Sequence, residues 1–250
     1  MSKISMPKPN DNPRAKTVLI TGASSGIGLA LYKQYVSLGY QVITCGRDKE
    51  KLAQQTPLAT KWLVFDVNDI DAVAKAAEQI IHIDILILNA GTCLYIDNAK
   101  QFDGHCFREV IKTNLLSMGA LLENLLPKVS SGGQLAMVSS SATIFPFSRA
   151  QAYGASKAGV DYLANSLRID LANDHIDVCL IHPGFIKTPL TDKNNFSMPF
   201  LLTAEEAAKR IYQGIKHKKH YLQFPKRLTL LLKLLSYLPQ SFANSLLSKD

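Results

Sequence analysis

The chain of 250 residues is 47% apolar and 19% charged, proportions typical of one folded globular domain. Its net charge is +8, but no basic stripe is interleaved with aromatic residues, so we expect no nucleic-acid partner. The four cysteines lack CxxC spacing and no cluster of His, Asp or Glu accompanies them, so we expect reduced thiols, no metal site and a cytoplasmic location.

Residues 1–16 contain three prolines and no apolar segment, which predicts a flexible N-terminal extension rather than a signal peptide. From Thr17 onward, short apolar runs alternate with longer helical patterns. The predicted strands span residues 17–21, 41–45, 61–65, 83–88, 134–139, 177–182 and 220–224. Most are apolar almost throughout, as expected of parallel strands covered by helices on both faces. The repeated βα units therefore predict an α/β fold with a doubly wound parallel sheet.

Two helix boundaries can be read from the sequence. The helical stretch at residues 29–39 ends at Gly39, and a later helix begins near Thr203, which has the spacing of a capping box with Glu206.

The segment TGASSGIG, residues 21–28, follows the first predicted strand and opens the first predicted helix. Gly22 permits a tight turn, Gly26 lets the backbone approach a diphosphate, and Gly28 allows the helix to pack closely on the strand. The helix N-terminus would present free N–H groups to the anion. Glycines also serve ordinary turns, but the strand before this loop and the helix after it favour a phosphate-binding loop.

Further short motifs follow the glycine loop in a fixed order: Asp66-Val67, Asn89-Ala90-Gly91, Asn114, the serine run at 139–141, YGASK at 153–157 and PGFIKT at 183–188. With the G-xxx-G-x-G spacing, they resemble the short-chain dehydrogenase/reductase family over residues 17–188. The resemblance implies a Rossmann-like sheet of seven parallel strands in the order 3-2-1-4-5-6-7, within a cofactor-binding catalytic domain at residues 17–226. It also implies an oxidoreductase that moves a hydride between a nicotinamide cofactor and a carbonyl/alcohol pair.

The end of the second strand, which reads CGRD, indicates the cofactor. In dinucleotide folds an acidic residue about 20 residues beyond the glycines selects NAD, and a nearby arginine can hold the 2′-phosphate of NADP. By resemblance that acid would fall at Gly46, and Arg47 follows it. We therefore expect NADP rather than NAD, although Ser25 is neutral where many NADP-using relatives are basic, and Asp48 lies close by. An exposed loop cation is the alternative for Arg47.

The other cofactor contacts are implied by the resemblance. Asp66 would accept a hydrogen bond from the adenine amino group, and an acid at a helix N-terminus is its alternative. Asn89 would line the adenosine side, and holding neighbouring strands together is its alternative. The predicted cofactor-binding set is Gly22, Ser24, Ser25, Gly26, Ile27, Gly28, Arg47, Asp66, Val67, Asn89, Ala90, Gly91, Tyr153, Lys157, Pro183, Gly184, Ile186 and Thr188.

Tyr153 and Lys157 are four residues apart in a helical stretch, so both side chains lie on one face. A phenol with a pKa of about 10 is a poor base near neutral pH, and a nearby ammonium stabilises the phenolate. We predict that Tyr153 transfers the proton with the help of Lys157. The resemblance to the family implies that Ser140, thirteen residues before Tyr153, donates a hydrogen bond to the substrate oxygen, with Ser139 and Ser141 as competitors.

Asn114 resembles the family asparagine that holds a water against the lysine and completes a proton path to solvent. The alternative is a polar residue inside a helix that bonds its own backbone. His182, just before Pro183, we interpret as mainly structural, because Tyr153 and Lys157 already supply the acid/base chemistry.

The C-terminus departs from the usual family pattern, since residues 227–250 form an apolar tail that we expect to be helical. Its apolar run, residues 228–238, is shorter than the roughly 20 residues needed to span a bilayer. We expect the run to pack on the domain or in a homodimer interface. Shallow membrane contact, aided by Lys226 and Arg227, is the alternative.

Residues 189–202 are predicted to form a mobile lid over the substrate pocket. Its lining would be Phe196, Met198 and Phe200, with Leu94, Phe145 and Phe147 on the opposite wall, which favours a lipophilic small-molecule substrate. Two alternatives to the enzyme are a catalytically quiet NADP-binding regulator and a membrane-surface interaction protein on the same fold.

Overall fold

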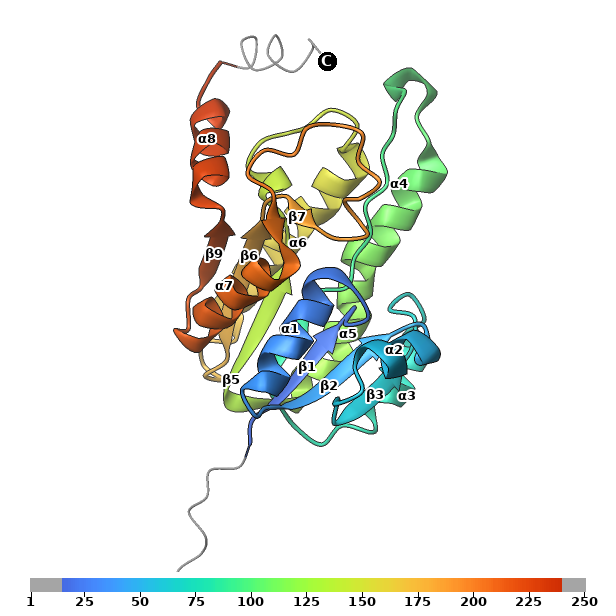
Figure 1. Ribbon diagram of the computed structural model, residues 1–250, viewed down its shortest axis with the longest axis vertical. Coiled ribbons are helices and arrows are strands. Elements are labelled where there is room, and N and C mark those ends of the chain that lie inside the picture. Colours follow the sequence, from blue (N-terminus) through green and yellow to red (C-terminus); the bar gives the residue numbers. More distant parts are fainter. Residues whose placement is uncertain (1–14, 240–250) are drawn as a thin grey trace, which may run out of the picture.

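The computed structural model describes residues 15–239, and both the predicted N-terminal extension up to residue 14 and the tail from residue 240 lie outside this range (Figure 1). One sheet of seven strands has the order β3-β2-β1-β4-β5-β6-β9, and all its neighbours pair in parallel. This confirms the predicted architecture. The strands are β1 (Thr17–Thr21), β2 (Gln41–Gly46), β3 (Lys61–Val64), β4 (Ile83–Leu88), β5 (Val129–Val138), β6 (Asp177–Pro183) and β9 (Tyr221–Phe224).

Helices cover both faces of the sheet because the strands carry buried apolar side chains on both sides. One face packs against α3 (Ile70–Ala77), α5 (Ser117–Leu125) and α6 (Gln151–Asp170). The other packs against α1 (Gly26–Ser37) and α7 (Ala204–Lys216). The predicted capping box at the start of α7 is confirmed: the Glu206 N–H donates to Thr203 Oγ1 at 3.1 Å, and the Thr203 N–H donates to Glu206 Oε2 at 2.9 Å.

The remaining elements lie at the sheet edges and in its connections. They are α2 (Lys49–Gln55), α4 (Gly104–Ile111), α8 (Lys226–Ser236), the small parallel pair β7 (Ile186–Lys187) and β8 (Leu202–Thr203), the 3₁₀ turns η1 (Ala99–Gln101), η3 (Leu126–Lys128) and η4 (Ser141–Thr143), and the π-helical turn η2 (Lys112–Leu116).

The strand order reverses between β1 and β4, and a ligand crevice is expected outside the carboxyl ends of these strands. The loops after β1, β4, β5 and β6 all begin at that edge of the sheet (Figure 1). The fold therefore brings together the segments that carry the predicted site residues.

The C-terminal helix α8 follows the edge strand β9 and packs partly on the domain. Its Leu228 and Leu232 are buried against Phe145, as expected for one face of the apolar run. Phe147, which with Phe145 was predicted for the wall of the substrate pocket, packs against the same cluster. Within residues 15–239, no helix is both long enough and apolar enough to cross a membrane.

Candidate active site

The glycine loop joins β1 to α1 at the carboxyl edge of the sheet (Figure 1). Gly22 and Gly26 have φ angles of 66° and 53°, in the left-handed region that favours glycine. A Cβ atom on Gly22 would lie 2.9 Å from Ala90 Cα, and one on Gly26 would lie 3.1 Å from Thr188 Cγ2. The glycine loop therefore packs closely against the segments that follow β4 and β6.

The N-terminus of α1 is open to an anion. Ser25 is the N-cap residue, yet its side chain makes no capping hydrogen bond, and the first turn contains no acidic residue. The N–H groups at this end consequently keep their partial positive charge. The loop residues Ser24, Ser25, Gly26 and Ile27 are all partly exposed. These features fit a diphosphate, and thus a dinucleotide cofactor.

Asn89 ties the end of β4 to the end of β1. Its Nδ2 donates to the Thr21 carbonyl oxygen at 3.0 Å, and the backbone N–H groups of Asn89 and Ala90 donate to Thr21 Oγ1 at 2.9 and 3.1 Å. A Cβ atom on Gly28 would lie 2.7 Å from Asn89 Nδ2. Asn89 therefore has the strand-holding role considered as its alternative, and Gly28 makes room for this link as well as for the helix.

Arg47 follows β2 with a side chain that is 76% exposed, and its Nη1 lies 3.6 Å from Asp66 Oδ2. Ion pairs between exposed groups are weak, so the guanidinium can turn toward a phosphate. Asp48 accepts a hydrogen bond from the Lys51 N–H at 2.9 Å and caps α2. The Asp48 carboxylate is thus engaged in capping α2 and does not pair with Arg47. Asp66 also accepts the Asn68 N–H at 2.9 Å.

Tyr153 and Lys157 lie on one face of α6, with Lys157 Nζ 5.9 Å from the centre of the Tyr153 ring. Lys157 is buried, and its Nζ donates to the Val138 carbonyl oxygen at the end of β5 at 2.8 Å. Burial lowers the pKa of Lys157 to about 8, while the charge of Asp161 acts in the opposite direction. With a pKa of about 8, the buried Lys157 amine is mostly protonated at neutral pH and loses its proton at a mildly alkaline pH.

Burial raises the pKa of Tyr153 to about 12, and the hydrogen bond with Ser140 acts to lower it. With a pKa in that range, the phenol is protonated at neutral pH. It can therefore donate a proton to a substrate oxygen, and it needs additional positive charge before it can accept one.

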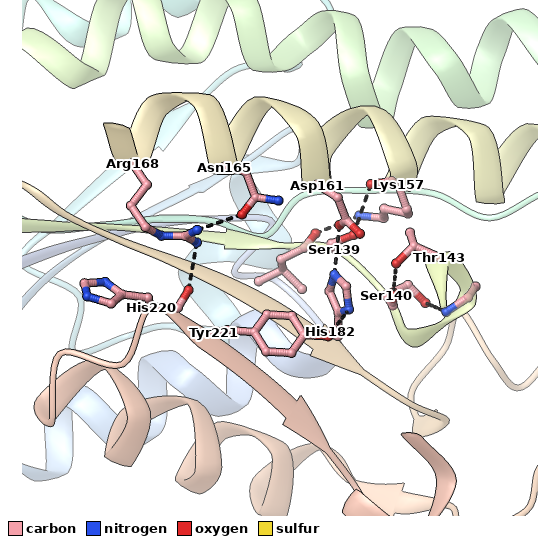
Figure 2. A network of polar contacts seen from close by, with 12 residues as sticks. Ser139, Ser140, Thr143, Lys157, Asp161, Asn165, Arg168, His182, His220 and Tyr221 are labelled. Atoms are coloured by element: carbon pink, nitrogen blue, oxygen red, sulfur yellow. Dashed lines mark hydrogen bonds and ion pairs between the residues drawn. The ribbon is translucent and has the colours of Figure 1, made fainter. Parts of the chain in front are cut away.

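The hydroxyl groups of the serine run after β5 have different roles: one makes a structural hydrogen bond, and another lies at the site. Ser139 Oγ donates to the Lys157 carbonyl oxygen at 3.2 Å and so fastens α6 to the end of β5 (Figure 2). Ser140 Oγ accepts the Ala142 N–H at 3.1 Å, which leaves its own proton free, and it contacts Tyr153. Ser139 therefore has a structural partner, and Ser140 is the member of the run that meets Tyr153.

Asn114 lies in the π-helical turn η2 and is fully buried. Its Oδ1 accepts the Thr92 N–H at 2.7 Å, and its Nδ2 donates to the Thr92 carbonyl oxygen at 2.9 Å and to Ser156 Oγ at 3.0 Å. The alternative in which Asn114 bonds its own helix backbone is wrong. A Cβ atom on Gly91 would lie 3.1 Å from Asn114 Oδ1 and 3.6 Å from Lys157 Nζ, so these three residues meet at one point.

The segment after β6 lies next to the glycine loop, where Thr188 approaches Gly26. The Gly184 N–H donates to the Phe224 carbonyl oxygen at 2.7 Å, directly after Pro183 ends β6. The Thr188 N–H donates to Thr191 Oγ1 at 3.0 Å, and this hydroxyl donates to the Ile186 carbonyl oxygen at 2.6 Å. Thr191 thus fixes the predicted residues Ile186 and Thr188 beside the glycine loop.

The segment at residues 189–202 is linked to the loop after β4. The Tyr95 hydroxyl donates to Asn194 Oδ1 at 2.8 Å, and the Tyr95 ring meets Phe196 at 5.8 Å between ring centres. The Phe185 ring lies 6.1 Å from Phe196 between ring centres. These aromatic rings form an apolar cluster next to the loop that carries Gly91.

A family model described as short chain dehydrogenase matches residues 16–198. The chain belongs to the short-chain dehydrogenase family. It is 32% identical over 236 residues to an uncharacterized oxidoreductase of Myxococcus xanthus, covering 90% of this chain and 93% of the relative. It is also 30% identical over 212 residues to a probable NADP-dependent dehydrogenase of Haemophilus influenzae, covering 81% and 82%. A crystal structure of a short chain dehydrogenase from Burkholderia cenocepacia in complex with NADP is similar at a TM-score of 0.82 and 20% identity, covering 94% and 98%.

Several residues of this short-chain dehydrogenase support its site without having been predicted from the sequence. Thr21, Ser156 and Thr191 each hold a predicted residue through a side-chain hydroxyl, and the Cys93 thiol lies close enough to Tyr153 and Lys157 to affect both pKa values. Hydroxyl groups at strand ends and in helices are common, so the sequence contains no signal that distinguishes these.

Proposed function

We propose that this short-chain dehydrogenase is an NADP(H)-dependent oxidoreductase that interconverts a carbonyl group and an alcohol. The observation that carries the proposal is the meeting of the two halves of the site around Gly91. Ala90, its neighbour, packs on Gly22 of the glycine loop, and Gly91 itself lies against Asn114 and Lys157. A phosphate-binding loop and a buried phenol–ammonium pair can therefore serve a single bound ligand.

The glycine loop and the N-terminus of α1 would hold the cofactor diphosphate, and Arg47 would hold the 2′-phosphate. Asp66 and the Val67 amide would bind the adenine, while Ile186 and Thr188 would bind the nicotinamide carboxamide. The NADP-dependent relative from Haemophilus influenzae supports this cofactor. When bound, the cofactor supplies or accepts the hydride.

Tyr153 would give its proton to the carbonyl oxygen during reduction and remove it from the alcohol during oxidation. Ser140 would donate a hydrogen bond to the same oxygen and stabilise its developing negative charge. The Lys157 ammonium would stabilise the phenolate that Tyr153 becomes, and Asn114 would hold a water that restores the proton from solvent. The raised pKa of Tyr153, about 12, keeps the phenol protonated and supports its role as donor in reduction.

The substrate would be a lipophilic small molecule. Tyr95, Phe185 and Phe196 form an aromatic cluster beside the loop that carries Gly91, and the side chains of Phe196 and Phe200 remain 40% and 43% exposed. Apolar side chains that stay accessible next to a buried polar centre are typical of pockets for apolar ligands.

Tyr153→Phe tests the proposal directly. Purified protein with NADPH would be screened against ketones, aldehydes and 3-oxoacyl thioesters by following NADPH absorbance. Tyr153→Phe should reduce turnover by about 100-fold or more, because the proton donor is lost, while NADPH binding measured by fluorescence stays unchanged. Tyr162→Phe, an exposed tyrosine of the same helix, is the matched control.

Retention of the original rate by Tyr153→Phe would show that the acid/base assignment is wrong. A wild-type protein that binds NADPH tightly and turns over none of these substrates would favour the catalytically quiet regulator instead.

We also infer a peripheral contact between α8 and an anionic membrane surface. Leu230, Leu231 and Leu234 remain exposed on α8, and Lys226 and Arg227 begin the helix. A groove of about 1000 Å³ between α7 and the start of α8 is lined by further cations, including Lys209, Arg210 and Lys219. A homodimer formed through this face is the competing assignment, but it would bring two positively charged surfaces together.

A further inference from the structure

Three polar side chains joined by hydrogen bonds lie one helical turn beyond Lys157, on the side away from Tyr153. His182 Nε2 lies 2.9 Å from Asp161 Oδ1, and the Tyr221 hydroxyl lies 2.8 Å from His182 Nδ1 (Figure 2). The His182 side chain is only 5% exposed, and the Asp161 side chain is 20% exposed. In the proposed mechanism, none of Asp161, His182 and Tyr221 contacts the substrate, so this hydrogen-bonded group has no role in that mechanism.

The spacing of residues on α6 and the pairing of strands β6 and β9 bring Asp161, His182 and Tyr221 together. Tyr153, Lys157 and Asp161 recur every four residues along α6, which places them in one row on the helix. His182 is two residues after Leu180 in β6, and Leu180 pairs with Tyr221 of β9. Side chains two apart in a strand share a face, so His182 and Tyr221 both point toward α6.

One arrangement of protons allows both hydrogen bonds among Asp161, His182 and Tyr221 to form. If imidazole Nε2 carries the proton, it donates to Asp161 Oδ1, and Nδ1 accepts from the Tyr221 hydroxyl. The Asp161 carboxylate then accepts a hydrogen bond from the buried His182 ring. In this arrangement the His182 ring, held by Tyr221, fixes the position of the Asp161 carboxylate.

The charge of Lys157 responds to few groups. Among residues 15–239, its pKa is affected by burial, which lowers it, and by Asp161 and Cys93, which raise it. Burial raises the pKa of the Cys93 thiol, so Cys93 is uncharged at neutral pH. Tyr153, the other titratable neighbour on α6, has a pKa of about 12 and is likewise uncharged. Asp161 is therefore the negative charge that opposes the loss of the Lys157 proton.

We propose that Asp161 is a positioning residue for the reaction, the fixed counter-charge that keeps Lys157 an ammonium, and that His182 and Tyr221 hold its carboxylate in place. The proposal rests on the proposed function in that Lys157 assists proton transfer by Tyr153. It adds the need for a negative charge at Asp161, which lies four residues beyond the YGASK motif that ends at Lys157.

The direct test measures the titration of Lys157 without substrate or cofactor. Lysine labelled with ¹³C at Cε would be incorporated into the full chain, and the Lys157 signal would be identified by its absence in Lys157→Arg. Asp161→Asn should move the Lys157 midpoint down by roughly one pH unit, because an opposite charge nearby favours the charged form. Asp161→Glu, which keeps the charge, should leave the midpoint close to that of the wild type.

Asp170→Asn is the matched control, because it removes a negative charge from an exposed position on the same helix. It should not move the Lys157 midpoint. An unchanged midpoint in Asp161→Asn, or an equal shift in Asp170→Asn, would overturn the proposal, and so would a shift in Asp161→Glu as large as that in Asp161→Asn.

The kinetic test uses the pH dependence of kcat for NADPH-linked reduction. A midpoint lowered by one unit from about 8 predicts a roughly fivefold loss of kcat at pH 8 in Asp161→Asn and almost none at pH 6. A merely structural role would lower kcat equally at both pH values, and that result would overturn the proposal. If instead the wild type proves inactive or Tyr153→Phe stays active, the proposed function fails while the measured Lys157 titration still decides the role of Asp161.

Discussion

At the scale of single residues, we propose that the preference for NADP over NAD depends on Arg47. Its exposed guanidinium has one weak partner, Asp66, and the nearby Asp48 caps α2. A 2′-phosphate would give the guanidinium a charge-assisted contact. Arg47→Asp should therefore lower kcat/KM for NADPH by about 10- to 100-fold and change that for NADH little, as measured with the same substrate.

Lys33→Asp makes the same charge change on an exposed face of α1 and is the control for long-range electrostatics. An NADPH/NADH ratio unaffected by Arg47→Asp, or changed equally by Lys33→Asp, would remove Arg47 from the cofactor site.

The serine run shows how far single residues can be predicted from the sequence. The family's spacing before Tyr153 favoured Ser140 but left Ser139 and Ser141 as competitors. The structure separates Ser139 from Ser140 because the Ser139 hydroxyl bonds the Lys157 carbonyl oxygen. The contact between Asp161 and His182 was not predicted for a related reason: they are 21 residues apart, and only the packing of α6 on β6 brings them together.

At the scale of elements, the glycine loop depends on a close backbone approach that can be tested at Gly28. A Cβ atom there would clash with the Gly22 carbonyl oxygen and lie 2.7 Å from Asn89 Nδ2, which links β1 to β4. Gly28→Ala should lower the free energy of unfolding by about 1–3 kcal/mol, as overpacking does, and should weaken NADPH binding. Urea unfolding and fluorescence titration would measure the two effects.

Gly119→Ala is the matched control, because Gly119 lies in α5 with open space around its Cβ position. It should stabilise the protein by about 0.5–1 kcal/mol through helix propensity and leave NADPH binding unchanged. Equal behaviour of the two variants would mean that the loop tolerates a side chain at residue 28.

The existence of the strands could be predicted because apolar β-branched runs recur between helical patterns, and their order in the sheet followed from the resemblance to the family. The start of β5 could not, because the SSGG segment before Gln134 is typical of a turn, yet β5 begins at Val129 and accommodates Gly132 at a φ of 79°. The π-helical turn that carries Asn114 was also not predicted. A π turn changes the direction of one side chain without altering the apolar pattern of its helix, so the sequence shows no sign of it.

At the scale of the whole molecule, charge and exposed apolar surface gather at one end of the chain. Residues 203–239 contain eight of the lysines and arginines and only two acidic residues, Glu205 and Glu206. The same segment includes α8, whose Leu230 and Leu234 are 61% and 59% exposed. Apolar side chains ringed by cations match the chemistry of an anionic lipid surface.

This match predicts that the full chain binds vesicles containing phosphatidylglycerol and does not bind vesicles of phosphatidylcholine alone, as measured by co-sedimentation. Leu230→Glu combined with Leu234→Glu should abolish binding, since both carboxylates would face the lipid, and raised salt should weaken binding by the wild type. Ile81→Glu, an exposed apolar residue between α3 and β4, should bind as the wild type does. A wild-type chain that ignores anionic vesicles but forms a dimer in light scattering, and that the two leucine changes make monomeric, would assign this face of α8 to self-association instead.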